Sequence, residues 1–248
     1  MTGIAKLERY GLLRAAGEDA RVFLHAQLTN DIENLLPGQA RYAGWCSAKG
    51  RLLATFLVVP YSGGFLLQLS RDLVPAVAKR LSMFVLRAKL KITDVSAEWG
   101  QFGQWSDGSP NPLGVQEQDG AITVGIEPGR SLVLAPANKR VPTLPEEQWT
   151  LAEVRAGRAL IEQPTQDQFV PQMVNLELAG GVDFRKGCYP GQELYSDDAP
   201  GQPSGVVVNA AGDESLAVLQ TSAVEAKSKI RAQPQAAALE VLPLPYPR

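Results

Sequence analysis

The spacing of apolar and polar positions divides the first 95 residues into short strands and two helices. Two runs rich in β-formers flank Lys49-Gly50, which predicts a hairpin turn at that pair. Apolar side chains recur at helical spacing over residues 71–84, and Gly17-Glu18-Asp19 leads into an earlier helix with acidic residues in its first turn. The predicted strands cover residues 10–15, 42–48, 52–59, 65–69 and 86–95. This succession of elements is compatible with a ferredoxin-like subdomain.

The pattern changes in the second half of the chain. Residues 122–124 and 131–134 predict short strands, and Pro145 followed by two glutamates predicts the start of a helix over residues 146–159. Beyond Leu194 the chain becomes loop-rich, with two further short apolar stretches. We therefore expect a small β module at the C-terminal end.

Composition places the 248-residue chain among ordinary globular proteins, with 45% hydrophobic and 20% charged residues. A net charge of −2 gives no electrostatic case for direct nucleic-acid binding. No apolar run is long enough to span a bilayer, so no membrane partner is expected, and the first residues lack a signal-peptide core. Two cysteines, no CxxC pair and one histidine argue against a structural metal site. The expected location is the cytoplasm.

Candidate chemistry is concentrated in residues 170–194, where a thiol, two cations, a phenol and a carboxylate occur close together. Arg185 and Lys186 would favour the thiolate form of Cys188, and Pro190 suits the first turn of a helix, whose N-terminus would add to that effect. The alternative is that Cys188 is a buried, inert cysteine in a tight turn. These residues alone leave both interpretations open.

Three motifs carry a resemblance to a known family. The sequence KGCYPGQE at residues 186–193 is similar to the K-G-C-Y-x-G-Q-E signature of the YgfZ family. Residues 169–176 match that family's F-x-P-Q-x-x-N-L segment, and residues 46–51 match its C-x-A-K-G-[RK] turn. The motifs occur in the family's order and cover the chain up to about Leu194. YgfZ proteins are folate-binding and related in fold to the glycine-cleavage T-protein, an aminomethyltransferase.

The resemblance implies an α+β, multi-domain aminomethyltransferase-like fold with a ferredoxin-like subdomain and a small C-terminal β module. The implied division assigns residues 1–45 and 115–195 to a discontinuous folate-binding domain. Residues 46–114 would form the ferredoxin-like subdomain, and residues 196–248 the C-terminal module.

The resemblance also implies a site. Two family tryptophans linked to folate match Tyr10 and Trp149 here, although either could simply be a core aromatic. Lys186 and Cys188 would form the functional motif; Lys186 could instead be a solvated cation. The implied folate contacts are Tyr10, Trp149, Gln172, Asn175, Tyr189, Gln192 and Glu193. On residue type alone, loop-backbone roles suit Gln172 and Asn175 as well.

The function implied is that of a tetrahydrofolate-binding accessory protein in iron–sulfur cluster assembly or repair, with indirect effects on tRNA modification. Iron–sulfur proteins or assembly factors are the candidate partners. A folate-dependent aminomethyl or one-carbon transferase is the alternative, disfavoured because no aspartate stands in the motif. A third interpretation is a non-catalytic binding module. One departure from the family is the lack of Lys or Arg between Glu193 and Lys227, where relatives are basic. Another departure is Pro190, at a position where threonine is the commonest residue in the family.

Overall fold

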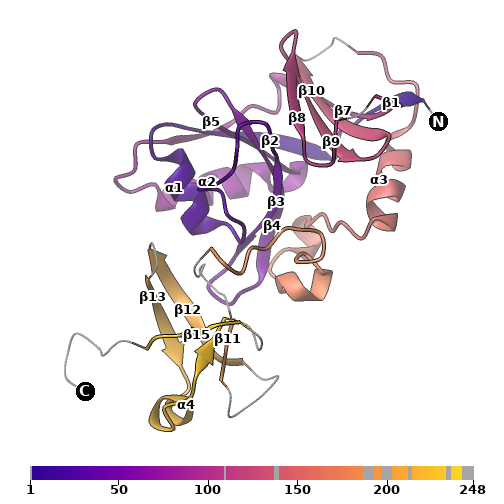
Figure 1. Cartoon of the computed structure of the whole chain (residues 1–248). Coiled ribbons are helices and arrows are strands. Elements are labelled where there is room, and N and C mark those ends of the chain that lie inside the picture. The colour runs from indigo at the N-terminus through magenta and orange to yellow at the C-terminus, as the bar shows by residue number, and fades with distance from the viewer. Residues whose placement is uncertain are drawn as a thin grey trace.

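Three five-stranded sheets organise the chain in the computed structural model (Figure 1). The structure describes residues 2–108, 110–136, 140–186, 193–196, 203–211, 214–232 and 236–241. The fold is α+β. In the described residues, no helix has the length and apolar character needed to cross a membrane.

The first sheet is ferredoxin-like with one added strand. Its order is β3-β4-β5-β2-β6, and all neighbours are antiparallel. The chain runs through one strand and helix α1 (Ala20–Gln27), then through a three-stranded meander, the 3-10 turn η1 (Arg71–Leu73) and helix α2 (Val74–Phe84), and ends on an edge strand. Its strands are β2 (Tyr10–Ala16), β3 (Arg41–Cys46), β4 (Leu52–Tyr61), β5 (Gly64–Ser70) and β6 (Lys91–Asp94).

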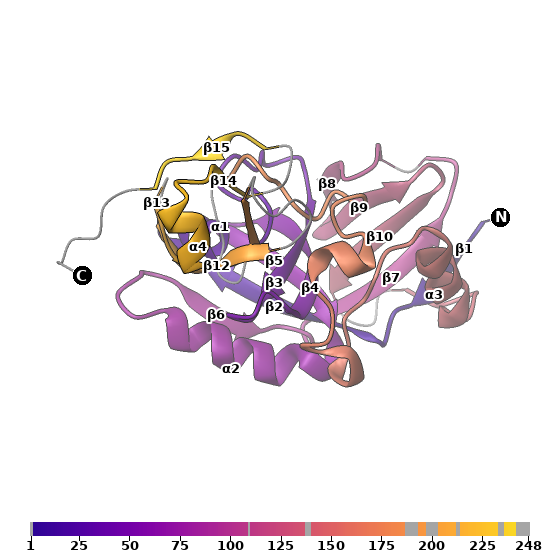
Figure 2. The same cartoon turned by 90° about the horizontal axis from the view of Figure 1, so that it is seen from below.

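Both faces of this sheet are buried. Leu13 and Leu67 lie in one core with residues of both helices, and Figure 2 shows α2 along that side of the sheet. Their neighbours Leu12 and Leu66 belong to a second core, which lies between this sheet and the second of the three sheets. Because side chains alternate along a strand, burial on both sides requires nearly continuous apolar sequence, as in β4.

The second sheet has the order β1-β7-β10-β9-β8. Its strands are β1 (Gly3–Lys6), β7 (Trp99–Trp105), β8 (Val115–Gln118), β9 (Ala121–Glu127) and β10 (Arg130–Pro136). Helix α3 (Glu146–Arg155) packs on this side of the molecule, and the 3-10 turns η2 (Gln163–Thr165) and η3 (Pro171–Val174) follow it. The central core therefore lies between two sheets whose strands come from separate parts of the chain.

The third sheet is the expected C-terminal β module, with the order β13-β12-β11-β14-β15. It lies apart from the other two sheets at the bottom of Figure 1. Its elements are β11 (Glu193–Ser196), β12 (Pro203–Ala211), β13 (Glu214–Leu219), α4 (Thr221–Glu225), β14 (Ile230–Arg231) and β15 (Ala238–Leu239).

The strand pairing differs from the domain division expected from the sequence. Strands β2 and β3 lie almost entirely in residues 1–45, which were assigned to the folate-binding domain, but they share a sheet with β4 and β5. Strand β7 lies in residues 46–114, which were assigned to the ferredoxin-like subdomain, but it pairs with β1 and β10 of the other sheet. The ferredoxin-like unit thus covers Tyr10 to Asp94 rather than residues 46–114. The helix expected to begin near Pro190 starts outside the described residues, and Glu193–Ser196 is a strand, β11.

Candidate functional site

A small cavity between the first two sheets brings together the two predicted ligand aromatics. Tyr10 and Trp149 both line it, and both are buried, at 9% and 2% exposure. The cavity volume is about 50 Å³. Polar lining comes from Tyr42, Thr55, Gln68, Glu153 and Arg158. The sequence-based expectation that Tyr10 and Trp149 face one cavity is confirmed.

Arg9 explains why these two aromatics meet. Its backbone N–H donates to the Glu146 carboxylate at 2.9 Å, and its guanidinium donates to the Thr150 hydroxyl at 3.2 Å. Glu146 stands in the first turn of α3, where a carboxylate is favoured by the helix dipole. The start of β2 is thereby fixed to the start of α3, so Tyr10 lies next to Trp149.

The Trp149 ring is tightly held. Trp105 meets it edge-on at a centroid distance of 5.8 Å, and the Arg130 guanidinium carbon lies 4.5 Å from its centroid. A Cβ added at Gly103 would come within 2.2 Å of the ring, so glycine is required beneath it. Such packing fixes the orientation of the ring toward the cavity.

Two arginines and two glutamates form a charge network behind Trp149. Glu153 contacts Arg130 at 2.7 Å and Arg158 at 3.0 Å, and Glu127 binds the same two arginines at 2.8 and 3.1 Å. Burial opposes ionisation of Glu127, but hydrogen bonds from the arginines outweigh it and lower its pKa. Burial also opposes the charge of Arg158, and its contacts with Glu153 and Glu127 help raise the pKa. The Glu127 carboxylate is therefore held ionised.

Two other polar side chains of the cavity, Thr55 and Gln68, already have partners. The Thr55 hydroxyl donates to the Ala159 carbonyl at 3.1 Å and accepts from the Ile161 N–H. The Gln68 amide donates to Gln101 at 2.8 Å. Burial raises the pKa of Tyr10, which keeps its phenol neutral. The cavity thus offers aromatic faces and polar side chains, of which Thr55, Gln68, Glu153 and Arg158 are already paired.

The 3-10 turn η3 and the residues that follow it close one side of the cavity with Val174, Leu176 and Ala179. The predicted contacts Gln172 and Asn175 lie in the same segment, but both are exposed and do not line the cavity. Asn175 has a left-handed backbone, with φ 52° and ψ 35°, and ends η3. Asparagine tolerates this conformation better than most residues, which gives it a backbone role here.

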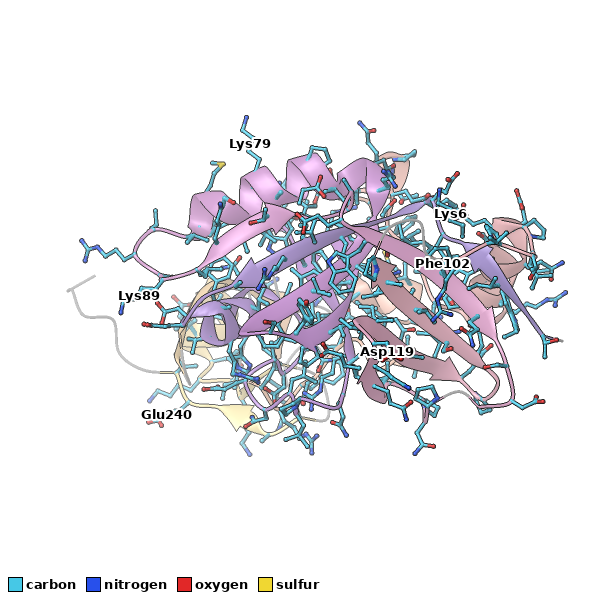
Figure 3. The ribbon with its side chains drawn as sticks, turned by 90° about the horizontal axis from the view of Figure 1, so that it is seen from above. Lys6, Lys79, Lys89, Phe102, Asp119 and Glu240 are labelled. Carbon is cyan, nitrogen blue, oxygen red and sulfur yellow. The ribbon has the colours of Figure 1, made fainter. Side chains whose placement is uncertain are left out.

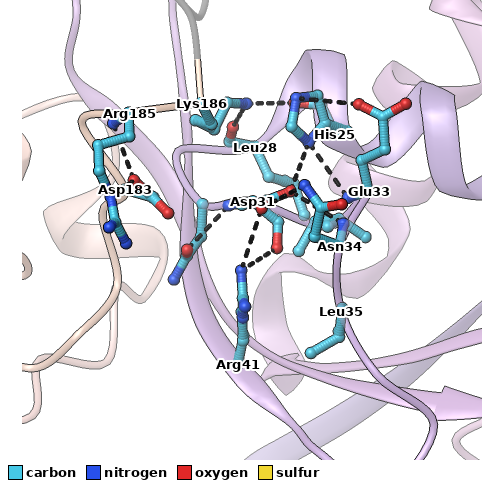
Figure 4. Close-up of polar contacts among 12 residues, drawn as sticks. His25, Leu28, Asp31, Glu33, Asn34, Leu35, Arg41, Asp183, Arg185 and Lys186 are labelled. Atoms are coloured by element: carbon cyan, nitrogen blue, oxygen red, sulfur yellow. Dashed lines mark hydrogen bonds and ion pairs between the residues drawn. The ribbon is translucent and has the colours of Figure 1, made fainter.

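Lys186, the first residue of the signature, is buried against the end of α1 (Figure 4). Its ammonium group donates to the carbonyl of His25, and to that of Leu28 at 2.6 Å. These carbonyls belong to the helix C-terminus, where a cation is stabilised. The sequence-based alternative of a solvated cation does not describe this lysine, which is 8% exposed.

Thr29 and Asn30 position the chain that leads to Lys186. The Thr29 hydroxyl donates to the Gly181 carbonyl at 2.6 Å, and the Asn30 amide donates to the Gly180 carbonyl at 2.7 Å. Both side chains are buried. Thr29 and Asn30 thereby hold the segment that leads to the signature.

His25 and Asp31 extend this cluster (Figure 4). The Glu33 N–H donates to His25 Nδ1 at 3.2 Å, which requires a neutral imidazole. Burial and the charge of Lys186 lower the His25 pKa, which favours the neutral imidazole, although Asp31 lies 3.1 Å from Nδ1 and opposes this shift. Arg41 donates to the Asp31 carbonyl oxygen.

The other candidate residues of the signature are described only in part or not at all. Cys188, Tyr189 and Gln192 lie outside the described residues, and Glu193 begins β11, where only the backbone is described. Cys46 is buried at the end of β3, and burial, aided by the charge of Asp167, raises its pKa to about 12.

No protein-family model matches the chain. It is 30% identical to the tRNA-modifying protein YgfZ of Klebsiella pneumoniae (strain 342), over 77% of this chain and 65% of that protein. It is 27% identical to the protein of the same name from Vibrio vulnificus (strain CMCP6), over 78% and 64% respectively. The chain is a homologue of YgfZ. It spans slightly less than two thirds of the length of these curated relatives.

The fold of this YgfZ homologue is that of the aminomethyltransferases. A crystal structure of the glycine cleavage system aminomethyltransferase T from Bartonella henselae superposes with a TM-score of 0.52 at 14% identity. The match covers 89% of this chain and 79% of that protein. It confirms the expected fold class.

Sequence reasoning missed the charge network and the two anchoring residues at 29 and 30. Glu153 stands four residues after Trp149 on α3, and this spacing places both on one helix face, so it could have been found. Arg130 pairs across a separation of 23 residues in sequence, and Thr29 reaches Gly181 across 152. No local pattern indicates either contact.

Proposed function

We propose that this chain binds tetrahydrofolate or a derivative and serves as an accessory protein in iron–sulfur cluster assembly or repair. Iron–sulfur proteins or assembly factors would be its partners, and effects on tRNA modification would follow indirectly. The observation that supports this most is the convergence of Tyr10 and Trp149 on one cavity in an aminomethyltransferase fold. The relatives are named as tRNA-modifying proteins, and the cytoplasm is the compartment that suits this role.

The chemistry of the cavity suits a pterin, but its present volume does not. Aromatic faces and a rim of amide, hydroxyl and carboxylate groups are what a flat polar heterocycle requires. Ligand sites usually enclose about 300–1,000 Å³, and this cavity has about 50 Å³. Binding there therefore requires the cavity to widen, and we expect the segment containing Val174 and Leu176 to move outward, because it belongs to neither sheet.

A larger hollow next to the signature could receive the acidic part of the ligand. It has a volume of about 870 Å³ and is lined by Arg41, Asp183 and Arg185, among others. Arg185 is almost fully exposed and pairs only loosely with Asp183, at 3.6 Å. Its guanidinium is thus available to a carboxylate.

Within this proposal the signature has two separate roles. Lys186 fixes the start of the motif to the end of α1 through the contacts described above. Cys188 is the proposed functional thiol. Because Cys46 is buried and its raised pKa keeps it protonated at neutral pH, it is poorly suited to that chemistry.

One observation in the structure favours the transferase alternative. Glu153 supplies a carboxylate in the cavity, which the motif itself lacks. Both of its oxygens, however, are engaged by arginines: Oε1 by Arg130 and Arg158, and Oε2 by Arg158 at 3.1 Å. A proton-transfer role would require breaking that network, so we rank this function second.

Tetrahydrofolate titration followed by tryptophan fluorescence tests the ligand and the site together. Binding should change the emission of the wild-type chain, and Trp149→Phe should lose most of that change. Trp45→Phe is the matched control, since Trp45 is equally buried but lies in the other core. Saturable binding with an unchanged signal in Trp149→Phe would place the ligand elsewhere; no binding would refute the folate proposal.

Complementation tests the accessory function separately. Cells that lack the protein should lose activity of cluster-dependent enzymes, and the wild-type chain should restore it. Cys188→Ala should restore it poorly and Cys46→Ala nearly fully. Full rescue by Cys188→Ala would exclude the proposed thiol chemistry. Aminomethyl-donor turnover by the purified chain would instead favour the transferase.

A further inference from the structure

A second hollow shares Tyr10 with the central cavity. Its volume is about 590 Å³, within the range of small-molecule sites. Tyr10 lines both spaces. The other lining residues are Lys6, Leu7, Glu8, Arg71, Ser96, Trp99, Gly100, Gln101, Phe102, Arg140 and Pro142. Figure 3 shows this region with Lys6 and Phe102 labelled.

The charge of this hollow is positive, although the chain as a whole carries −2. Lys6, Arg71 and Arg140 outnumber the single acid, Glu8. Glu8 pairs with Lys6 at 2.8 Å, but both side chains are more than half exposed, so this pair is weak.

The two arginines have donors to spare. The Arg71 guanidinium makes no hydrogen bond or ion pair with the residues that the structure describes. Among the described residues, the Arg140 side chain donates one hydrogen bond, from Nη1 to the Gln104 amide oxygen at 2.9 Å. A guanidinium offers five N–H donors in a planar fork that matches a carboxylate or a phosphate. Two such groups around one hollow indicate an anionic ligand.

Aromatic residues form the apolar part of the same hollow. Trp99 is half-buried, and Tyr61 fixes its ring edge-on at a centroid distance of 5.3 Å. Phe102 pairs with Lys6 across β1 and β7. A Cβ at Gly100 would lie 2.7 Å from the Phe102 ring, so glycine lets that ring lie against the backbone. This side of the hollow therefore suits a planar ring.

We propose that this hollow binds a small aromatic anion, with the ring against Trp99 and the carboxylate or phosphate between Arg71 and Arg140. A long polyanion is not the favoured ligand, because the overall negative charge would repel it. A nucleoside monophosphate and the p-aminobenzoylglutamate part of a folate both combine an aromatic ring with an anionic group. The inference does not depend on the proposed function, since neither ligand contains a pterin.

Calorimetric titration of the full chain at low ionic strength tests the proposal. The probes are adenosine monophosphate, p-aminobenzoylglutamate, and glutamate as the anion without a ring. At least one aromatic anion should bind, and glutamate should bind at least tenfold more weakly. Whichever aromatic probe binds shows whether the ligand resembles a nucleotide or a folate fragment. Absence of binding by both aromatic probes at millimolar concentration, or equal binding of glutamate, would overturn the proposal.

Paired substitutions locate the site. The double variant Arg71→Gln and Arg140→Gln should weaken binding roughly 10–100-fold, as expected for the loss of charge-assisted contacts. The matched control is Lys79→Gln with Lys91→Gln, which removes two exposed cations outside the hollow. Equal weakening by both pairs would indicate only general charge attraction and would refute the site. Inorganic phosphate should compete with the aromatic probe on the wild-type chain, which checks the anion contact without any substitution.

Discussion

Replacing Lys186 by methionine tests whether the first residue of the signature anchors the loop. The substitution keeps an unbranched apolar stem and removes the ammonium group that contacts the carbonyls of His25 and Leu28. Hydrogen bonds to charged groups contribute about 1.5–3 kcal/mol each, so two contribute roughly 3–6 kcal/mol. Part of this is offset, because methionine avoids the cost of burying a charge.

We therefore expect Lys186→Met to lower the free energy of unfolding by roughly 2–4 kcal/mol. For a chain of this size that corresponds to a Tm lower by about 5–12 °C. Arg185→Met is the matched control one residue away. Its side chain is 92% exposed and its ion pair is long, so we expect a change within about 0.5 kcal/mol.

Urea unfolding followed by circular dichroism and tryptophan fluorescence measures both variants, and coincidence of the two signals justifies a two-state fit. Equal stability of the Lys186 and Arg185 variants would refute the anchoring role. The ammonium group would then be required for chemistry rather than for structure.

Three further predictions concern His25, Cys188 and Gly103. His25 has a lowered pKa, so the unfolded chain binds more protons near its ordinary pKa of about 6.5; stability should fall as pH drops from 7.5 toward 5.5, and less so in His25→Gln. Iodoacetamide at neutral pH should modify Cys188 well before Cys46, whose raised pKa keeps the thiol protonated. Gly103→Ala should destabilise the chain by about 1–3 kcal/mol through overpacking and shift the emission of Trp149.

Each of these has its own check. A stability profile that is unchanged in His25→Gln would show that this histidine does not titrate differently in the folded chain. Mass spectrometry that finds Cys46 modified first would contradict the thiol assignment. Gly38→Ala controls for Gly103→Ala, because a Cβ at Gly38 meets nothing within 4 Å; equal losses in the two would exclude a clash with Trp149.

The sequence indicated the strands and helices of the ferredoxin-like unit correctly but placed the unit too late in the chain. The hairpin around Lys49-Gly50 follows from local turn chemistry, and it forms between β3 and β4. The unit's first strand, β2, is joined to β5 and β6 by pairing across 48 to 81 residues in sequence. Hydrophobic alternation identifies a strand but does not identify its neighbours.

The candidate site shows the same limit. Tyr10 and Trp149 were found through resemblance, and their shared cavity depends on Arg9 contacts that span 137 to 141 residues. The buried role of Lys186 depends on carbonyls 158 and 161 residues away. A backbone carbonyl has no sequence signature, so this partner could not have been predicted from residue type.

The two parts of the site are joined by one short segment. Val174 to Ala179 closes the cavity beside Trp149, and the next two residues, Gly180 and Gly181, are held by Asn30 and Thr29. A side chain at Gly181 would clash with Leu176, within 2.6 Å, so the turn and the cavity wall fit each other closely. An outward shift of Leu176 that admits a pterin must therefore be absorbed within a few residues of the signature. If folate binds in the central cavity, its binding and the position of the signature are mechanically coupled, whereas a ligand in the hollow at Arg71 would leave that segment unmoved.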